Sequence, residues 1–317
     1  MAGSRLDLIV AGRLATSRTA AATLIANGSV TVNGTRERSS FRPGETDVIT
    51  VVPTPAPTPR GEVLGEDIPL RVIFEDDDLL VVDKAAGMVV HPAPGNWSGT
   101  LVNALIGRGG DLSDGGSPER AGLVHRLDKE TSGLLVVARS EVAHRRLSAA
   151  ISERRVSRRY AAMAWGHLTA DTLTVDKPIA RDPNDRKRMA VVATGKTART
   201  DFHRLARFAG ADLLRAHLHT GRTHQIRVHL SSVGHPVVGD DVYGGGGGRR
   251  LADLPARRHF LHAAWLRFHH PVNGELLDFR SPLPDDLHRS FAALAESPEL
   301  YSDPDPLTTF GFYDAAV

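Results

Sequence analysis

The sequence contains no cysteine, and this absence excludes several kinds of site. Without thiols there is no disulfide, no thiolate nucleophile and no zinc site of the cysteine type. Long apolar runs are missing as well, because no segment reaches the ~20 apolar residues that a membrane span needs. The N-terminus, MAGSRLDLIV, has charges of both signs and too short an apolar stretch for a signal peptide. We therefore expect a globular, cytoplasmic protein that has no membrane partner.

Complete nucleotide-binding loops are also missing. The end of a phosphate-binding P-loop is suggested by VVATGKT, but Ala190 stands where that motif needs a glycine five residues before Gly195. A dinucleotide-binding loop is suggested by YGGGGGRR, but Arg249 takes the place of the last glycine and no helical pattern follows. The glycine run is therefore expected to be a flexible loop.

Histidine could still hold a metal, and the chain has fifteen histidines. His217 and His219 are two residues apart, and His224 and His229 are five apart. Both pairs lie in apolar, strand-like surroundings and have no carboxylate partner nearby in sequence. We therefore expect neither a metal site nor a cofactor.

Basic charge is unevenly distributed along the chain. The net charge is +2, but seven acidic residues and a single arginine follow Pro284, so residues 1–284 carry +8. Only five of the 39 basic residues are lysines, and arginine suits bidentate phosphate contacts and stacking on bases. A GC-rich coding bias explains the number of arginines equally well. Where the arginines lie along the chain is more informative than how many there are. Seven arginines and two glutamates lie in RSEVAHRRLSAAISERRVSRRY, a density that suits a polyanion.

The first 52 residues have the pattern of a small separate domain. Helical apolar spacing occurs in SRLDLIVAG and in TSRTAAATLIANG, with Thr16 or Ser17 as the N-cap and Gly28 as the C-terminal stop. Alternating residues in SVTVNGTRER lead into Asn33-Gly34, a strong hairpin signal, and DVITVV supplies a further strand. The pattern predicts two short helices followed by short strands.

Residues 53–61, PTPAPTPRG, are too rich in proline to pack and are expected to form a stiff linker. Residues 62–284 then mix helical stretches such as VAHRRLSAAISERR with strand-like runs, which are DLLVVD, GLLVVA, DLLRAHL and HQIRVHL. The lack of a regular βαβ rhythm favours an α+β domain with a mainly antiparallel central sheet flanked by helices. Residues 285–317 form an acidic C-terminal tail, which is expected to end in irregular and mobile chain.

One loop holds an unusual concentration of charge. Two apolar runs in GLVHRLDKETSGLLVVAR enclose five ionisable residues, which are His125, Arg126, Asp128, Lys129 and Glu130. If the two runs are strands, the loop is held rigidly, and Arg126 and Lys129 keep Asp128 ionised as a nucleophile or base. Glu130 is free to point elsewhere, so a glycosidase with two carboxylates is disfavoured. From spacing alone, an aspartate in ordinary ion pairs fits as well as catalysis.

The N-terminal domain resembles a known RNA-binding module. Its sequence, RLDLIVAGRLATSRTAAATLIANGSVTVNG, is similar to the α-L (S4-type) domain of a small-subunit ribosomal protein, tyrosyl-tRNA synthetases and several RNA-modifying enzymes. That module presents basic residues to RNA phosphates, and Arg13, Arg18 and Arg36 are the matching or nearby positions. The alternative is that these arginines are only solvated. The resemblance implies that residues 1–52 bind RNA and perform no chemistry.

A second resemblance covers the chain from about Ile68 to Pro284. The loop HRLDKETSG matches the H-R-L-D-x-x-T-S-G signature of the RluA/RluD-like family of ribosomal large-subunit RNA pseudouridine synthases. Further similar segments are PLRVIFEDDDLLVVDKAAGMVVHPAPGNWSGTLVNAL, SRRYAAMAWG and LHTGRTHQIRVHLSSVGHPVVGDDVYG. One position departs from the family, because Ala85 follows Lys84 where proline is usual. The resemblance implies a pseudouridine synthase domain over residues 62–284.

The resemblance also implies roles for individual residues. Asp128 matches the essential carboxylate, and Tyr160, at the end of the arginine-rich helix, matches a tyrosine on which the uracil stacks. Arg222 is matched to the basic residue that pairs with the carboxylate and keeps it ionised. Arg126 is placed to fill the gap that a flipped uridine leaves in the RNA, and His125 is grouped with it as an RNA contact.

The implied reaction isomerises uridine in RNA to pseudouridine. The base leaves C1′ of the ribose, rotates and rejoins through C5, so no atom is gained or lost and no cofactor is needed. Asp128 could attack C1′ or abstract the 2′ proton to give a glycal, and the sequence does not choose between them.

The implied partners are RNA, most of all 23S ribosomal RNA or pre-ribosomal particles, and the chain is expected to act as a monomer. The alternative is a non-catalytic RNA-binding or ribosome-assembly protein with the same fold. A weaker alternative is a glycosidase that acts on RNA or nucleosides.

Overall fold

The computed structural model divides the chain into two compact units, Met1–Glu62 and Val63–Val317. It describes residues 4–14, 18–26, 28–51, 63–93, 96–114, 120–250 and 252–314. The expected linker at 53–61 and the expected N-cap at Thr16 or Ser17 lie outside these ranges. Within them, no helix is long and apolar enough to cross a bilayer.

The N-terminal unit has the elements that its sequence predicts. They are α1 (Leu6–Arg13), α2 (Arg18–Ala26), β1 (Val30–Val32), β2 (Thr35–Arg36) and β3 (Ile49–Val51). Asn33 and Gly34 have φ angles of 51° and 79°, the left-handed pair that a two-residue hairpin turn needs, and they join β1 to β2. Gly28, with φ 80°, follows α2 as the expected stop. Both local predictions are therefore confirmed.

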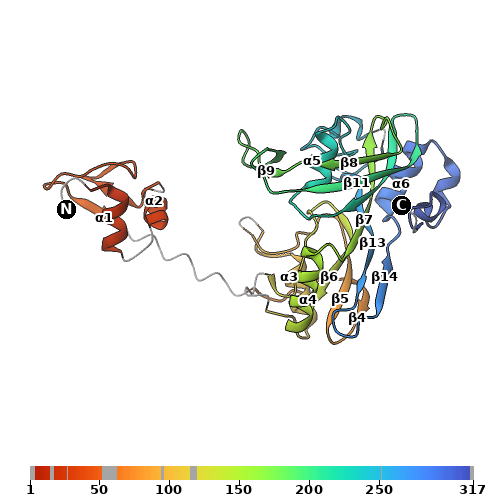
Figure 1. The fold of residues 1–317 in the computed structure, drawn as a ribbon, viewed down its shortest axis with the longest axis horizontal. Coiled ribbons are helices and arrows are strands. Elements are labelled where there is room, and N and C mark those ends of the chain that lie inside the picture. Colours follow the sequence, from red (N-terminus) through yellow and green to blue (C-terminus); the bar gives the residue numbers. More distant parts are fainter. Residues whose placement is uncertain are drawn as a thin grey trace. The chain divides into compact units, whose positions relative to one another are not determined.

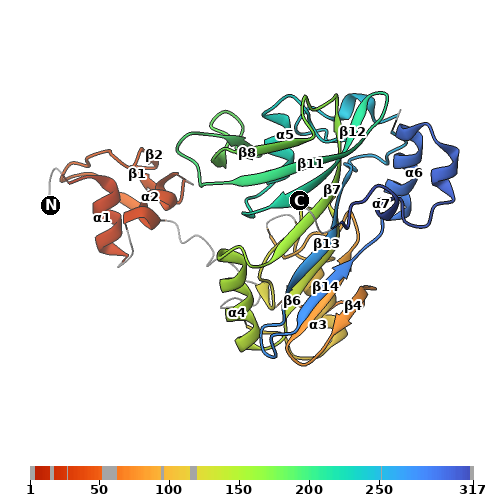
Figure 2. The ribbon, with the colours of Figure 1, turned by 45° about the vertical axis from the view of Figure 1, so that its right-hand side comes forward.

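The larger unit is built on one nine-stranded sheet with the order β4-β5-β6-β13-β7-β12-β11-β8, and β14 pairs with β13 (Figures 1 and 2). Among the described strands only β6 and β13 pair in parallel, so the predicted mainly antiparallel α+β fold is confirmed. The strands are β4 (Arg71–Glu75), β5 (Leu79–Lys84), β6 (Ser132–Ala138), β7 (Ser157–Trp165), β8 (Thr172–Asp176), β11 (Arg199–Arg207), β12 (Ala211–Leu218), β13 (Leu261–His269) and β14 (Leu276–Arg280). A separate pair is formed by β9 (Ile179–Arg181) and β10 (Met189–Val191).

Helices cover the sheet through alternate residues of its strands. On β6, Leu135 and Val137 pack in one cluster with α3, whereas Leu134 and Val136 pack in another with α4. The helices of this unit are α3 (Leu101–Arg108), α4 (Glu141–Ser152), α5 (Gln225–Ser231), α6 (Asp285–Ala295) and α7 (Pro306–Thr309), and short 3-10 turns are η2 (Gly246–Gly248) and η3 (Pro298–Tyr301). Because strand residues alternate in direction, apolar residues on both faces make β6 buried along its whole length.

The strand predicted in HQIRVHL is wrong, because residues 225–231 form the helix α5. Every residue of α5 from Gln225 to Leu230 is buried. When the polar residues of a segment are buried as well, the alternation of apolar and polar residues no longer distinguishes the period of a helix from that of a strand. A short buried helix and a strand therefore look alike in sequence. His224 precedes the helix with a left-handed φ of 57°.

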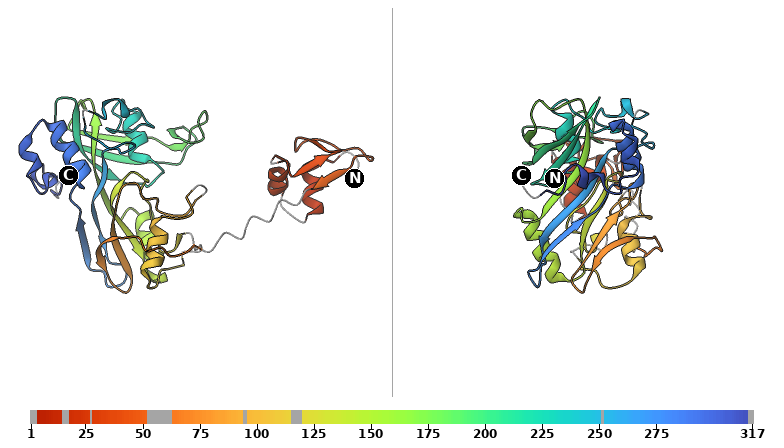
Figure 3. Two further views of the ribbon diagram at one scale, coloured as in Figure 1. Left: turned by 180° about the vertical axis from the view of Figure 1, so that it is seen from behind. Right: turned by 90° about the vertical axis from the view of Figure 1, so that its right-hand side faces the viewer.

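The expectation that the chain is irregular from residue 302 onward is also wrong for residues 302–314, which include α7 and the buried Phe312. Helices α6 and α7 pack beside the sheet (Figure 3), and Phe291, Leu307 and Phe312 are completely buried. The ring of Phe291 meets that of Phe208 edge-on at 5.5 Å between centroids. The acidic residues obscure an apolar spacing of four and three residues at Leu287, Phe291 and Leu294, which is typical of an amphipathic helix.

Substituting Phe291 by alanine should lower the free energy of unfolding by about 3–5 kcal/mol, since it empties a buried aromatic site. Tyr301→Ala is the control: this ring is 53% exposed, and its removal should change stability by at most about 0.5 kcal/mol. All three tryptophans lie in the larger unit, so urea denaturation followed by tryptophan fluorescence reports on it. Equal midpoints for the two variants would show that the tail does not contribute to the core.

Candidate active site

Five of the residues singled out in the sequence line one cavity of about 380 Å³. They are His125, Arg126, Asp128, Tyr160 and Arg222. They come from three separate segments, the loop before β6, strand β7 and the turn before α5. The structure therefore brings together side chains that lie up to 97 residues apart in sequence.

Buried contacts hold the loop that carries Asp128. Leu127 is 4% exposed and belongs to the main core cluster. The buried ammonium of Lys84 donates to the backbone carbonyl of Lys129 at 3.2 Å, and also to those of Ala85 and Met88 at 2.7 and 3.0 Å. Asp128 is therefore flanked by anchored residues on both sides, which limits the freedom of its carboxylate.

The residues that follow the loop, Thr131, Ser132 and Gly133, make contacts with β13 and with the residues just before it. The hydroxyl of Thr131 shares a hydrogen bond of 2.9 Å with His259, and that of Ser132 accepts one from Arg258 at 2.8 Å. A β-carbon on Gly133 would lie 2.4 Å from the carbonyl oxygen of Ala263, so only glycine permits β6 to approach β13 this closely. These residues fix where the loop ends and β6 begins.

The expectation that a strand lies on each side of the loop is wrong for the side that precedes it. Strand β6 follows the loop, but residues 122–124 form no strand and make a single bridge, Leu123 to Val137. His125 is held inward, because the backbone N–H of Val136 donates to its Nε2 at 3.1 Å. Burial, and then the charge of Arg158, lower the pKa of His125 to about 3, so its ring is neutral.

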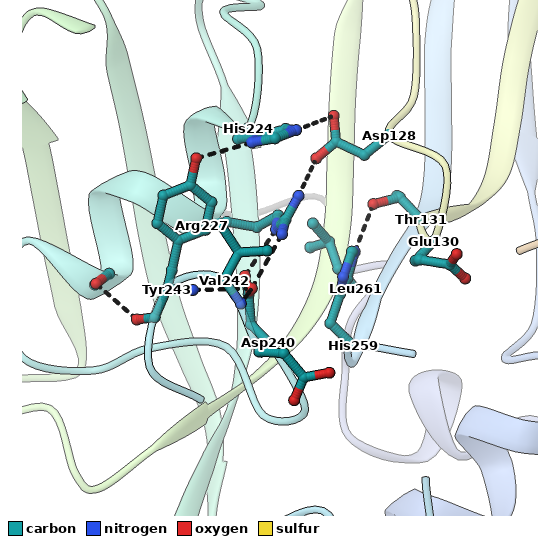
Figure 4. Close-up of polar contacts among 12 residues, drawn as sticks. Asp128, Glu130, Thr131, His224, Arg227, Asp240, Val242, Tyr243, His259 and Leu261 are labelled. Atoms are coloured by element: carbon teal, nitrogen blue, oxygen red, sulfur yellow. Dashed lines mark hydrogen bonds and ion pairs between the residues drawn. The ribbon is translucent and has the colours of Figure 1, made fainter. Parts of the chain in front are cut away.

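Asp128 pairs with Arg227, a residue that sequence analysis passed over. Nη1 of Arg227 donates to Asp128 Oδ2 at 3.0 Å, while its Nε and Nη2 donate to the two carboxylate oxygens of Asp240 at 2.7 and 3.0 Å (Figure 4). Asp240 also accepts the backbone N–H groups of Val242 and Tyr243. The planar guanidinium thus bridges two carboxylates that sit in different loops.

The predicted ion pair between Arg222 and Asp128 is therefore wrong. Arg222 lines the cavity, but its Nε donates to the backbone carbonyl of Thr197 at 3.0 Å. The misplacement follows from the secondary structure of HQIRVHL. In a strand, residues 224 and 227 would face opposite sides, whereas the helical geometry brings His224 and Arg227 to the same side. Recognising a buried helix there would have identified Arg227.

The surroundings keep Asp128 ionised. Burial by itself raises its pKa, but His224, Arg227 and His259 and the hydrogen bond from Arg227 outweigh that effect, so the pKa lies below its usual value. Nε2 of His224 is 4.0 Å from Asp128 Oδ1, and its Nδ1 shares a hydrogen bond with the hydroxyl of Tyr243. Burial lowers the pKa of His224 itself, which leaves Arg227 as the permanent positive charge.

Tyr160 lies on β7, and the expectation that it ends the arginine-rich helix is wrong because α4 stops at Ser152. The ring is 5% exposed and lines the cavity. Burial is the main cause that raises the pKa of its phenol to about 12, with Asp128 adding to it and Arg158 opposing it. The group is therefore protonated and neutral over the whole physiological range.

Among the described residues, one cluster has the ligand types of a metal site: Asp201, His217 and His219. Strands β11 and β12 bring them together, so the missing carboxylate partner noted in the sequence is supplied by the fold. Nε2 of His219 already shares a hydrogen bond of 2.5 Å with Asp201, and Arg199 lies 3.3 Å from the same carboxylate. The positive charge of Arg199 disfavours a further cation, and the absence of a metal stays a prediction.

The three arginines expected to bind RNA in the N-terminal unit differ in their surroundings. All three are exposed, so the difference lies in their contacts. The guanidinium of Arg36 lies over Gly28, where a β-carbon would come within 2.4 Å of it. Arg18 donates to the buried carboxylate of Asp7 at 3.1 Å, which Arg5 also contacts. Arg13 and Arg36 are therefore freer to meet a phosphate than Arg18 is.

The sequence matches two known families over different segments. Residues 78–232 match the family described as RNA pseudouridylate synthase, and residues 4–49 match the S4 domain. An RNA pseudouridine synthase of Bacillus subtilis, YlyB, is 44% identical over 272 residues, which cover 86% of this chain and 87% of that protein. The ribosomal large subunit pseudouridine synthase D of Zymomonas mobilis is 43% identical over 304 residues, 93% of this chain and 95% of that protein.

A solved structure, human RNA pseudouridylate synthase domain containing 1, has a similar fold. It shares 30% sequence identity with this chain at a TM-score of 0.56, and the match covers 76% of this chain and 98% of that one. The likeness thus spans nearly the whole of that protein.

Exchange of each arginine for methionine should separate the roles of Arg227 and Arg222. Arg227→Met removes the charge that pairs with Asp128, so the pKa of Asp128 should rise by about 1 unit or more. It also leaves Asp240 buried without its partner, at a cost of about 3–5 kcal/mol in stability. Arg222→Met is the matched control and should change neither quantity. Carboxyl NMR titration and urea denaturation measure both, and an equal effect of the two variants would contradict the assignment.

Proposed function

The chain belongs to the RNA pseudouridine synthase family, with an S4 domain at its N-terminus, and from this premise we propose that Asp128 is the essential carboxylate of its reaction. The protein is an isomerase that acts on RNA. The observation that supports Asp128 is its ion pair with Arg227 inside the cavity, 3.0 Å between Oδ2 and Nη1. An intact pair of this kind also speaks against the non-catalytic alternative, because RNA binding alone needs no buried, ionised carboxylate.

The surroundings of Asp128 suit either route of the reaction. An ionised carboxylate can attack C1′ of the target nucleotide, or it can take the 2′ proton, and both steps need the deprotonated form that Arg227 favours. The freed uracil must stay in the cavity while it rotates so that C5, in place of N1, meets C1′. A neutral, buried ring in the same cavity as the carboxylate serves that purpose, and we assign this role to Tyr160.

Access to the cavity requires the uridine to leave its stack. Unstacking costs a few kcal/mol, and a planar side chain that fills the gap offsets part of it. Arg126 is exposed at the cavity, two residues from Asp128, and is assigned to this role. Arg222 lies at the same cavity and is assigned to binding RNA, in place of the ion pair first expected of it.

The proposed substrate is uridine in 23S ribosomal RNA, free or in pre-ribosomal particles. Relatives from several bacteria are named ribosomal large subunit pseudouridine synthase D at 40–49% identity. The excess of positive charge in residues 1–284 suits such a polyanion. We further propose that the protein acts in the cytoplasm as a monomer. We also propose that it needs no metal or cofactor, because an isomerisation consumes no second substrate.

Asp128→Asn tests the proposed function most directly. The substitution keeps the shape of the side chain and removes its charge, so pseudouridine formation should fall by at least about 10³-fold, or ~4 kcal/mol, while RNA affinity changes little. Pseudouridine mapping of ribosomal RNA treated with each protein measures the first quantity, and filter binding the second. Formation of pseudouridine by the variant near the wild-type rate would refute the assignment.

The N-terminal domain should contribute affinity and no chemistry. Because Arg13 and Arg36 are exposed, binding of RNA by the full chain should fall more steeply with salt than binding by residues 63–317. Removal of each arginine–phosphate interaction should flatten the slope of log affinity against log salt by about 0.7–0.9. The full-length Arg13→Gln, Arg36→Gln variant is the control for truncation and should reproduce most of the change. Identical slopes in all three proteins would contradict this role.

A further inference from the structure

Arg158 is a buried cation without a partner in the wall of the catalytic cavity. It lies on β7 two residues before Tyr160, so the two side chains leave the same side of the strand. Only 5% of Arg158 is exposed. Within the described part of the chain it has neither a hydrogen bond nor an ion pair, and its Nε is sealed from solvent without an acceptor.

The other three fully buried arginines of this unit are satisfied, and two partly buried ones that each have a nitrogen without an acceptor, Arg159 and Arg188, lie over the rings of Trp265 and Tyr243. Arg227 bridges two carboxylates, and Arg258 contacts Asp286 together with main-chain carbonyls. Nη1 of Arg215 donates to the carbonyls of Phe312 and Asp314 at 2.9 and 3.0 Å. A buried charge without a counter-charge or acceptor destabilises a protein, and a fold that retains one gains something else from it.

The cavity around Arg158 has a strong excess of positive charge. Its described lining contains five arginines and one acidic residue, Asp128, which Arg227 already holds. The nearest titratable groups offer no compensation, because His125 and Tyr160 are neutral. Glycine at position 221 lets the backbone lie close to this guanidinium, since a β-carbon there would come within 3.0 Å of Nη1 of Arg158, and both residues line the cavity. The guanidinium of Arg158 is thus left without a negative group to balance it.

We propose that Arg158 binds a backbone phosphate of the nucleotide whose base enters the cavity. Uracil is neutral and cannot supply the missing charge, whereas every nucleotide of RNA carries one phosphate. A guanidinium forms two parallel hydrogen bonds to phosphate oxygens, and the water-poor wall strengthens them. The contact would fix the ribose between Arg158 and Asp128. This inference rests on the proposed function, because it takes RNA as the ligand of the cavity.

The test uses full-length protein and Arg158→Met, which keeps most of the volume and removes the charge. Affinity for uridine 5′-monophosphate or uridine 3′-monophosphate should fall at least about 10-fold in the variant, while affinity for uridine stays the same. The monophosphate whose affinity falls identifies the phosphate concerned. The salt slope of single-stranded RNA binding should flatten by about 0.7. Since an unpaired buried charge is removed, the urea midpoint should stay the same or rise.

Arg215→Met is the matched control, because Arg215 is equally buried but lies outside the cavity and donates to the main chain. Its urea midpoint should fall and its salt slope should not change. The proposal is overturned if Arg158→Met behaves as this control does, which would make Arg158 structural. It is also overturned if affinities for uridine and its monophosphates fall equally, which would place the contact on the base. Failure of the proposed function is a separate result, in which the wild-type protein binds RNA and forms no pseudouridine.

Discussion

The fork that Arg227 makes between Asp128 and Asp240 is the interaction on which the site depends. It joins the loop before β6 to the loop after α5, and it holds one carboxylate ionised in a place where burial alone would protonate it. Three nitrogens of one guanidinium are used, so neither carboxylate can move without weakening the other contact. Asp240 in turn accepts two backbone N–H groups, which extends the constraint to Tyr243.

Features that depend on a few neighbouring residues were predicted correctly from the sequence. The Asn33-Gly34 turn and the stop at Gly28 depend on a backbone conformation that few residues adopt, and both lie where they were expected. The match of the HRLDKETSG loop likewise led to Asp128, since that segment is continuous in the chain. Its partner could not be found in the same way, because the contact from Arg227 depends on the rotation of a buried helix.

Burial also explains why the predictions from sequence were wrong for the C-terminal tail and for the element that carries Tyr160. The tail has an acidic and irregular sequence, yet Phe291, Phe312 and Tyr313 close the core against residues of β7, β12 and β13. Tyr160 was matched to a family position but assigned to the wrong element. In each case the deciding information is which distant segment covers a residue, and a single sequence does not contain it in readable form.

The buried ammonium of Lys84 has a consequence for how the length of the chain before Asp128 can vary. It gathers the carbonyls of Ala85, Met88 and Lys129, so the chain between residues 85 and 129 departs from and returns to one anchored point. Lengthening such a closed excursion adds only a logarithmic entropy cost. Residues added at its exposed stretches, 96–99 and 107–111, should therefore leave the position of Asp128 unchanged.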